Sequence, residues 1–385
     1  MDWLRLIRSR RVGAVTFHRL LAEHGSAGEA LAALPAIARA AGVGDYQPCP
    51  PGVAAAELAA GSKAGARLLF LGDPFYPAAL AGLPDAPPFL WLQGDAGLLM
   101  RPMVALVGAR NASSLGVRMA RSLARGIGQA GFAVVSGLAR GVDSEAHMAA
   151  MATGTIAVQA GGVDVIYPGE NAALAEEIRQ HGLRLSEHPP GTQPQARHFP
   201  LRNRIVAGLS QAVVVVEAAA RSGSLITARL ALDQGREVLA VPGHPFDARA
   251  AGCNMLIRDG AALVRDTGDV LEALGQAAPV SSDTGELATA PTPRPMPKPA
   301  PQPVAPPEPE AAKPAAARPP RPAPDLSGVT RLHNMILDRL GPSPLPEDQL
   351  IRDLSLPPAS LAPELLTLEL EGRILRQPGG LLSRL

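Results

Sequence analysis

One short stretch of the chain combines cationic side chains with a single aromatic ring. It runs from Ala196 to Leu209 and reads ARHFPLRNRIVAGL, with three arginines and no acidic residue. Guanidinium groups neutralise phosphates and an aromatic face stacks on a nucleobase, so this combination predicts binding of a single-stranded nucleic acid. In the alternative interpretation, the arginines belong to a solvated helix start and the phenylalanine lies in the core. The candidate residues in this stretch are Arg197, Phe199, Arg202, Asn203 and Arg204.

Three glycine-containing loops offer further candidate contacts to phosphate. Each follows a short apolar run and opens a predicted helix: VGARNASSLG, SGLARGVDSEAH and ARSGSLITA. The N-terminus of a helix presents unpaired backbone N–H groups and the positive end of the helix dipole, and both attract anions. In the first loop Ser113 or Ser114 can also cap the helix, with Arg110 as a cation beside it. The candidate residues in these loops are Arg110, Ser113, Arg140, Ser222, Gly223 and Ser224.

Acid–base or metal chemistry is a second interpretation of the middle loop, because Asp143, Glu145 and His147 lie close together there. Their positions favour a structural role instead. Asp143 or Ser144 stands where a helix N-cap is expected, and Glu145 falls in the first turn, where an acid complements the helix dipole.

Cofactor-dependent chemistry is also disfavoured. The first glycine loop lacks the GxGxxG spacing, and no acid follows the next strand where a ribose-binding carboxylate would stand. The two cysteines, Cys49 and Cys253, lie far apart and have no histidine or cysteine neighbours at ligand spacing. We therefore expect no cofactor, no metal site and no disulfide.

Short apolar runs alternate with helical stretches from Arg67 onward, a pattern typical of a parallel sheet covered by helices on both faces. The sequence therefore predicts a doubly wound, Rossmann-like α/β domain. The candidate strands are residues 68–71, 89–92, 104–107, 133–136, 155–159, 212–217 and 237–241. The candidate helices are residues 116–130, 144–152, 174–181 and 224–234. In such a sheet the loops at the carboxyl ends of the strands form the binding crevice, so the arginine-bearing loops should meet there.

Composition divides the chain into four segments. Residues 1–65 have helical spacing, and their turn at Gly13 fits either a SAM-like helix-hairpin-helix module or a plain helix pair. Residues 66–278 form the predicted α/β domain. Residues 279–325 are dominated by Pro and Ala and predict a disordered linker. Residues 326–385 hold three helical stretches and a glycine-turned hairpin, which predict a winged helix that contacts either DNA or protein.

The bulk properties exclude some classes of protein. The 385 residues contain no apolar run that approaches the ~18 residues of a membrane span. The first residues alternate basic and apolar side chains without a cleavage site, so we expect a cytoplasmic protein with no membrane partner. The net charge is only +1, so affinity for nucleic acid must come from local clusters of arginine.

Taken in order, the motifs resemble the DNA-processing protein A family (DprA, also called Smf). The matching elements are VGARNASSLG, SGLARGVDSEAH, GGVDVIYPGEN, SEHPPG, HFPLRNRIVAGLS, EAAARSGSLITA, VPGHPFDARAAGCNMLIRDGA and LELEGRI. The resemblance implies an extended Rossmann domain that binds single-stranded DNA in a basic pocket, forms a homodimer, helps to load the recombinase RecA onto DNA and carries out no catalysis.

The resemblance also implies roles for single residues. Arg110 matches the family's phosphate-binding arginine, and Phe199, Arg202, Asn203 and Arg204 match its FPxRNR element. Relatives often have a lysine shortly before that phenylalanine, and Arg197 is expected to replace it here. Residues 254–263 resemble the region that relatives use for self-association, although their apolar side chains also fit a plain core.

A nucleoside monophosphate phosphoribohydrolase is the alternative function, because such enzymes resemble this sheet and bind phosphate at a glycine-rich loop. Their PGGxGT element is followed by a catalytic glutamate. Residues 220–227 read ARSGSLIT in the corresponding place, with no acid positioned after them. The sequence therefore favours a DNA-binding protein over this enzyme.

Overall fold

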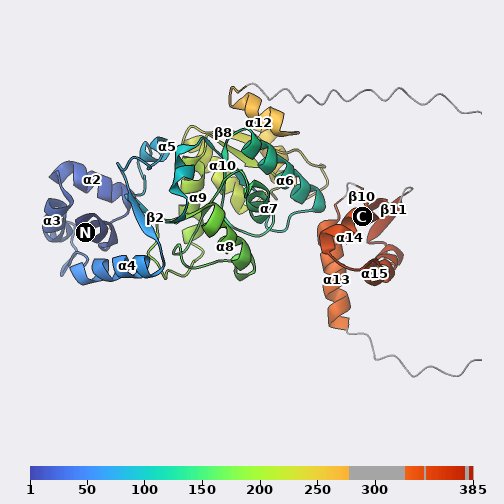
Figure 1. Ribbon diagram of the computed structural model, residues 1–385, viewed down its shortest axis with the longest axis horizontal. Coiled ribbons are helices and arrows are strands. Elements are labelled where there is room, and N and C mark those ends of the chain that lie inside the picture. The colour runs from blue at the N-terminus through green and yellow to red at the C-terminus, as the bar shows by residue number, and fades with distance from the viewer. Residues whose placement is uncertain (277–325, 342–343, 378–380, 385) are drawn as a thin grey trace, which may run out of the picture.

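The structure is a computed structural model that describes residues 1–276, 326–341, 344–377 and 381–384 (Figure 1). The predicted linker at 279–325 lies outside the described residues. The described parts form a helical N-terminal segment, a nine-stranded sheet with its helices, and a C-terminal module with a three-stranded sheet. None of the described helices is long and apolar enough to span a membrane.

The large sheet has the strand order β1-β2-β6-β5-β4-β3-β7-β8-β9. Its parallel strands are β3 (Met103–Val107), β4 (Ala133–Ser136), β5 (Thr155–Val158), β6 (Leu183–Ser186), β7 (Ala212–Val215), β8 (Glu237–Ala240) and β9 (Ala262–Leu263). The predicted α/β fold is therefore confirmed. At one edge the sheet also contains antiparallel pairs, in which β2 (Phe89–Gly94) pairs with both β1 (Arg67–Phe70) and β6.

Two strands of the large sheet were not predicted from the sequence, and each has a physical reason. The apolar run of β6 is interrupted by Arg184, which is buried and donates a hydrogen bond to the side-chain oxygen of Gln93 on β2. The other missed strand, β9, has two residues and is too short to show a periodic pattern.

Helices cover both faces of the sheet because the inner strands are apolar on both sides. Alternate residues of β3 belong to two separate cores, with Val104 and Leu106 on one face and Met103, Ala105 and Val107 on the other. The first face packs against α6 (Ser114–Gln129), α7 (Val142–Ala150) and α12 (Thr267–Ala273). The second packs against α5 (Ala78–Ala81), α9 (His198–Leu209), α10 (Gly223–Asp233) and α11 (Ala251–Arg258). A smaller cluster holds α8 (Ala172–His181) near β5.

The N-terminal helices are α1 (Asp2–Arg8), α2 (Ala14–His24), α3 (Ala27–Ala40) and α4 (Pro51–Lys63). The first three share a core around Leu6, Phe17 and Leu31. Helix α4 is fixed to the edge of the sheet, because Glu57 accepts hydrogen bonds from Trp91 Nε1 at 3.1 Å and from Arg8 Nε at 2.9 Å. The predicted domain boundary at residue 65 thus falls between two segments that share packing, and it stays a prediction.

The C-terminal module contains the three predicted helices, α13 (Leu326–Arg339), α14 (Glu347–Leu354) and α15 (Pro358–Leu370). Strands β10 (Leu345–Pro346), β11 (Ile374–Gln377) and β12 (Leu381–Arg384) form its antiparallel sheet, and it has its own apolar core. The module contacts the α/β domain through backbone acceptors. Arg339 Nη1 donates to the carbonyl of Ala112 at 3.1 Å, and Arg249 Nη1 donates to the carbonyl of Asp338 at 2.6 Å.

Candidate nucleic-acid interface

The strand order changes direction at β3, which lies between β4 and β7. The chain continues from β3 to β4 on one side and later returns to β7 on the other, so the loops after these strands diverge and leave a crevice. A cavity of about 620 Å³ occupies this place, and we call it the switch-point groove. Its polar and aromatic lining includes Arg110, Asn111, Asp143, Phe199, Arg202, Asn203, Arg221, Ser222, Ser224, Thr227 and Arg249, with Gly223 beside them.

Two aromatic rings and a cation form a wall between the groove and a smaller cavity beside it. Arg110 and Phe199 line both cavities, whereas Tyr167 lines the smaller one. The guanidinium carbon of Arg110 lies 5.3 Å from the centroid of the Phe199 ring, and the edge of Tyr167 packs against the same ring at 5.8 Å. Phe199 is half-buried, whereas Arg110 and Tyr167 are exposed. This wall can offer a cation to a phosphate and an aromatic surface to a base.

Tyr167 was not among the site residues predicted from the sequence. An aromatic residue that follows a buried strand, at the binding edge of the sheet, was the available signal. The smaller cavity, of about 210 Å³, is lined by Tyr167, Phe199 and Arg140 together. Arg140 therefore lies beside the groove rather than in it, and its Nε pairs with Glu170 at 3.0 Å.

Arg202 lies beneath the groove and is almost fully buried. A Cβ atom on Gly137 would stand 1.4 Å from Nη1 of Arg202, so only glycine leaves room for this guanidinium. The side chain of Asp143 accepts from the backbone N–H groups of Gly137 and Ala139 at 3.1 and 3.3 Å. Burial raises the pKa of Asp143 and lowers the pKa of Arg202, while the attraction between the two charges opposes both shifts.

The expectation that Asp143 or Ser144 caps α7 was wrong, because the N-cap is Gly141. Gly141 has a φ of +73°, and a Cβ atom there would lie 2.3 Å from the carbonyl oxygen of Ala109. The loops after β3 and β4 approach so closely that they require this glycine. The side chain of Asp143 consequently turns back to the loop, and the hydroxyl of Ser144 donates to the carbonyl of Gly141 at 2.9 Å.

Arg204 does not reach the groove. Its Nη1 donates to the carbonyl of Asp85 at 2.7 Å, its Nε pairs with the Asp85 carboxylate at 3.4 Å, and its Nη2 pairs with Glu187. It is 7% exposed, so its role in the structure is to anchor α9 to two distant segments. Arg197 is exposed as the N-cap of α9 and is not among the residues that line the groove.

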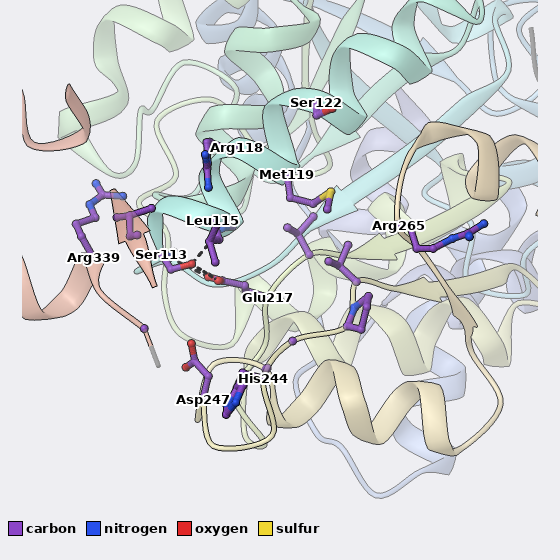
Figure 2. Close-up of a pocket in the computed structure, with 18 residues that line it drawn as sticks. Ser113, Leu115, Arg118, Met119, Ser122, Glu217, His244, Asp247, Arg265 and Arg339 are labelled. Carbon is purple, nitrogen blue, oxygen red and sulfur yellow. Dashed lines mark hydrogen bonds between the residues drawn. The ribbon is translucent and has the colours of Figure 1, made fainter. Parts of the chain in front are cut away.

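Ser113 caps α6 as predicted, but it is not among the residues that line the groove. It lines a different pocket together with Glu217 (Figure 2). Its backbone N–H donates to Glu217 at 2.9 Å, its hydroxyl donates to the same carboxylate, and its Oγ accepts from Gly116 N at 3.0 Å. Burial raises the pKa of Glu217. The anion position at the start of α6 is thus occupied by a carboxylate of the chain itself.

The start of α10 does open into the groove. Ser222 is its N-cap, its hydroxyl lies 2.7 Å from that of Ser224, and it accepts from the backbone N–H of Ser224 at 3.3 Å. Arg221 lies exposed beside them, and Arg249 approaches from the loop after β8. Neither arginine was predicted from the sequence as a site residue, although Arg221 directly precedes the predicted serines.

His147 is fully buried, and its Nδ1 lies 2.7 Å from the hydroxyl of Thr155. Burial, and next the charge of Arg202, lower its pKa to about 3. It does not line the groove, so the geometry agrees with the structural interpretation of this histidine. Within the described residues, no cluster of histidine, cysteine and acidic side chains has the geometry of a metal site.

Comparison with known proteins supports the architecture in all three parts of the chain. Residues 67–275 match the model of the DNA recombination-mediator protein A family. Residues 1–60 match the DprA-like N-terminal HHH domain, and residues 314–380 match the DprA winged helix domain. The helix-hairpin-helix and winged-helix predictions are therefore confirmed.

Individual relatives agree. The chain is 44% identical over 220 residues to the DNA processing protein DprA of Bacillus subtilis, covering 56% of this chain and 74% of the relative. The X-ray structure of DprA from Streptococcus pneumoniae is 44% identical with a TM-score of 0.52, over 54% of this chain and 73% of that one. DNA processing protein A from Helicobacter pylori, whose structure addresses its single-stranded DNA binding mode, is 32% identical with a TM-score of 0.51, over 54% and 95%. The chain therefore belongs to the DNA recombination-mediator protein A family.

Proposed function

We propose that the chain binds single-stranded DNA in the switch-point groove and acts as a non-catalytic recombination mediator. The observation that carries the proposal is the wall on which Arg110 lies against the ring of Phe199. A phosphate bound by the guanidinium would place the adjoining base next to an aromatic surface. Proteins that bind single strands without sequence preference use this combination of cations and stacking platforms.

The local charge of the groove favours a polyanion although the whole chain is almost neutral. Of the four arginines in its lining, Arg110 and Arg221 are exposed, whereas Arg202 is buried and Arg249 is paired with Asp247. Asp143 is the one acid in the lining. Because Asp143 is buried and held by two backbone N–H groups, it does not face the incoming phosphates. A duplex keeps its bases stacked in its interior, so only a single strand can use the aromatic wall.

The groove gives little support to the phosphoribohydrolase alternative. Such an enzyme needs a carboxylate directed at the sugar, whereas the side chain of Asp143 accepts hydrogen bonds from the loop beneath the groove. The start of α10 carries no acid from Gly223 to Ala228. Release of free base from nucleoside monophosphates would support the phosphoribohydrolase alternative. We expect the protein to bind DNA and to release no free base.

The C-terminal module fits a protein contact better than a DNA contact. Its third helix, α15, occupies the place of a recognition helix, and it contains Glu364 and Glu369 but no lysine or arginine. Arg376 on β11 is paired with both Glu347 and Glu369. A helix of this charge would be repelled by the phosphates along a major groove.

Homodimer formation and RecA loading are part of the proposal. Met255 on α11 and Leu263 on β9 are 37% and 43% exposed, which leaves apolar surface for a second copy of the chain. Light scattering would give the mass in solution. The rate at which RecA assembles on single strands coated with single-strand-binding protein would test loading, and we expect the chain to increase that rate.

The binding itself is tested by fluorescence anisotropy of a labelled oligonucleotide at several salt concentrations, with the matching duplex as control. We expect preference for the single strand and a fall in log affinity of about 0.7 per log unit of salt for each neutralised phosphate. Equal affinity for the duplex, or no binding at low salt, would contradict the proposal.

A further inference from the structure

We propose that Phe246 is a second stacking contact for a nucleobase, beyond the rim of the groove that Asn111 and Arg249 form. This inference rests on the proposed function and extends the path of the single strand past the wall made by Arg110 and Phe199. It concerns the loop of residues 242–250, which joins β8 to α11.

Phe246 is displayed to solvent to an unusual degree. Its side chain is 88% exposed, the highest value among the large apolar side chains that the structure describes, and the next is Met100 at 62%. A ring with this exposure adds almost nothing to the core, so folding does not explain it. The ring of His244 lies 5.6 Å from it, which makes a small aromatic surface of two rings.

Hydrogen bonds fix the conformation of the loop that presents Phe246. Asn254 exchanges hydrogen bonds with the backbone of Gly243 at 3.0 and 3.2 Å. Asp247 accepts from the backbone N–H and the side chain of Arg249 at 2.9 to 3.1 Å, and its own N–H donates to the carbonyl of His244 at 2.9 Å. Figure 2 shows His244 and Asp247 on this loop, across from Ser113 and Glu217. A fixed display of an aromatic ring reduces the entropy lost when a ligand binds.

The surface around Phe246 is continuous with the switch-point groove. A cavity of about 610 Å³ is lined by Phe246 together with Asn111 and Arg249, and both of these residues also line the groove. Arg384 of the C-terminal module forms part of its far side. A strand that leaves Phe199 across Asn111 therefore enters the space in front of Phe246.

The side chains around the cavity in front of Phe246 favour binding of a nucleobase over binding of a phosphate. Arg249 is already paired with Asp247 and donates to the carbonyls of Asp338 and Leu340. Its charge is thus largely satisfied, whereas Phe246 beside it is 88% exposed. A nucleobase has a flat π-face that can stack on it whatever the sequence.

The test scans 2-aminopurine, whose fluorescence is quenched by stacking, through an oligothymidylate bound to the full chain. We expect two positions of quenching, one lost in Phe199→Ala and the other in Phe246→Ala. Phe246→Ala should weaken binding of a long oligonucleotide by roughly tenfold without changing the salt dependence, because the variant removes stacking but no charge. Phe246→Trp should restore affinity, and Phe75→Ala, at a Phe that is 46% exposed outside the groove, is the matched control.

The outcomes separate this inference from the proposed function. If the wild type binds single strands and Phe246→Ala keeps both the affinity and the quenching pattern, the second contact is refuted and the groove stands. If Phe246→Ala changes the mass in light scattering and leaves DNA affinity intact, the ring belongs to a contact between copies and the inference is also refuted. If the wild type does not bind single strands at all, the proposed function fails with it.

Discussion

The guanidinium group of Arg110 lies over the ring of Phe199, 5.3 Å from its centroid. The two residues come from different parts of the chain, the loop after β3 and the first turn of α9. Their contact depends on the strand order, which places both at the carboxyl edge of the sheet. It gives the groove a cation and an aromatic ring at adjacent positions.

Arg110→Ala should weaken binding of single-stranded DNA and reduce the salt slope by about 0.7, because one neutralised phosphate is lost. Anisotropy titrations at several salt concentrations measure both quantities. Arg19→Ala is the matched control, since its side chain is 64% exposed on α2, far from the groove. A salt slope equal to that of the wild type would show that Arg110 does not neutralise a phosphate.

Arg204→Ala should act on stability rather than on DNA. The substitution leaves the half-buried Glu187 without its partner and removes the buried guanidinium from α9. Because removal of one member of a fully buried ion pair costs about 3 kcal/mol, we expect a loss of unfolding free energy somewhat below that value. Denaturant unfolding measures the loss, and Arg204→Lys should recover part of it. If the variant is as stable as the wild type and its DNA affinity depends less on salt, Arg204 contacts DNA instead.

Gly137→Ala tests the position of Arg202 without removing its charge. The new methyl group would occupy the place of the guanidinium and force it to move. We expect affinity for single strands to fall by roughly tenfold or more, as for the loss of one charged hydrogen bond. Gly52→Ala is the control, because a Cβ atom there meets nothing within 4 Å. Unchanged affinity in a folded Gly137→Ala variant would show that Arg202 is dispensable.

The buried histidines should make the fold sensitive to acid. The pKa of His147 is lowered to about 3 and that of His188 to about 4, in each case chiefly by burial. Below about pH 6.5 these two histidines are protonated in the unfolded chain but stay neutral in the folded chain. The free energy of unfolding therefore decreases as the pH falls below about 6.5. Each histidine contributes a slope of about 1.4 kcal/mol per pH unit between its two pKa values.

The substitution His147→Gln separates the contribution of His147 to the pH dependence of stability from that of His188. The amide can keep a hydrogen bond to Thr155 but does not titrate, so the unfolding free energy should fall less steeply between pH 6 and pH 4 than in the wild type. Exposed His181→Gln serves as control. Identical pH profiles for the wild type and His147→Gln would show that His147 is protonated in the folded chain.

Local pattern was sufficient to predict much of this protein. The alternation of apolar runs and helices indicated the sheet, and glycine loops with Arg110, Arg202 and Asn203 indicated side chains that do lie in the groove. These features depend on neighbours in sequence, or on the general rule that loops of a parallel sheet gather at one edge.

The errors came from contacts between distant segments. Arg204 and Arg202 lie in the same short stretch of sequence, so the local pattern does not distinguish them. Arg204 is buried because the fold brings Asp85 and Glu187 into ion pairs with it. Ser113 has the features of an anion site until Glu217, at the end of β7, takes the place of the anion. Tyr167 gained significance only because folding brings its ring against Phe199.

Binding of single-stranded DNA in the switch-point groove can be tested by photo-cross-linking of an oligonucleotide containing 5-bromouracil, followed by mapping of the modified peptides. We predict cross-links in the peptides that carry Tyr167 and Phe199, and their loss when unlabelled single strand competes. Cross-links confined to the N-terminal helices or to the C-terminal module, with none at the switch-point groove, would contradict the central claim.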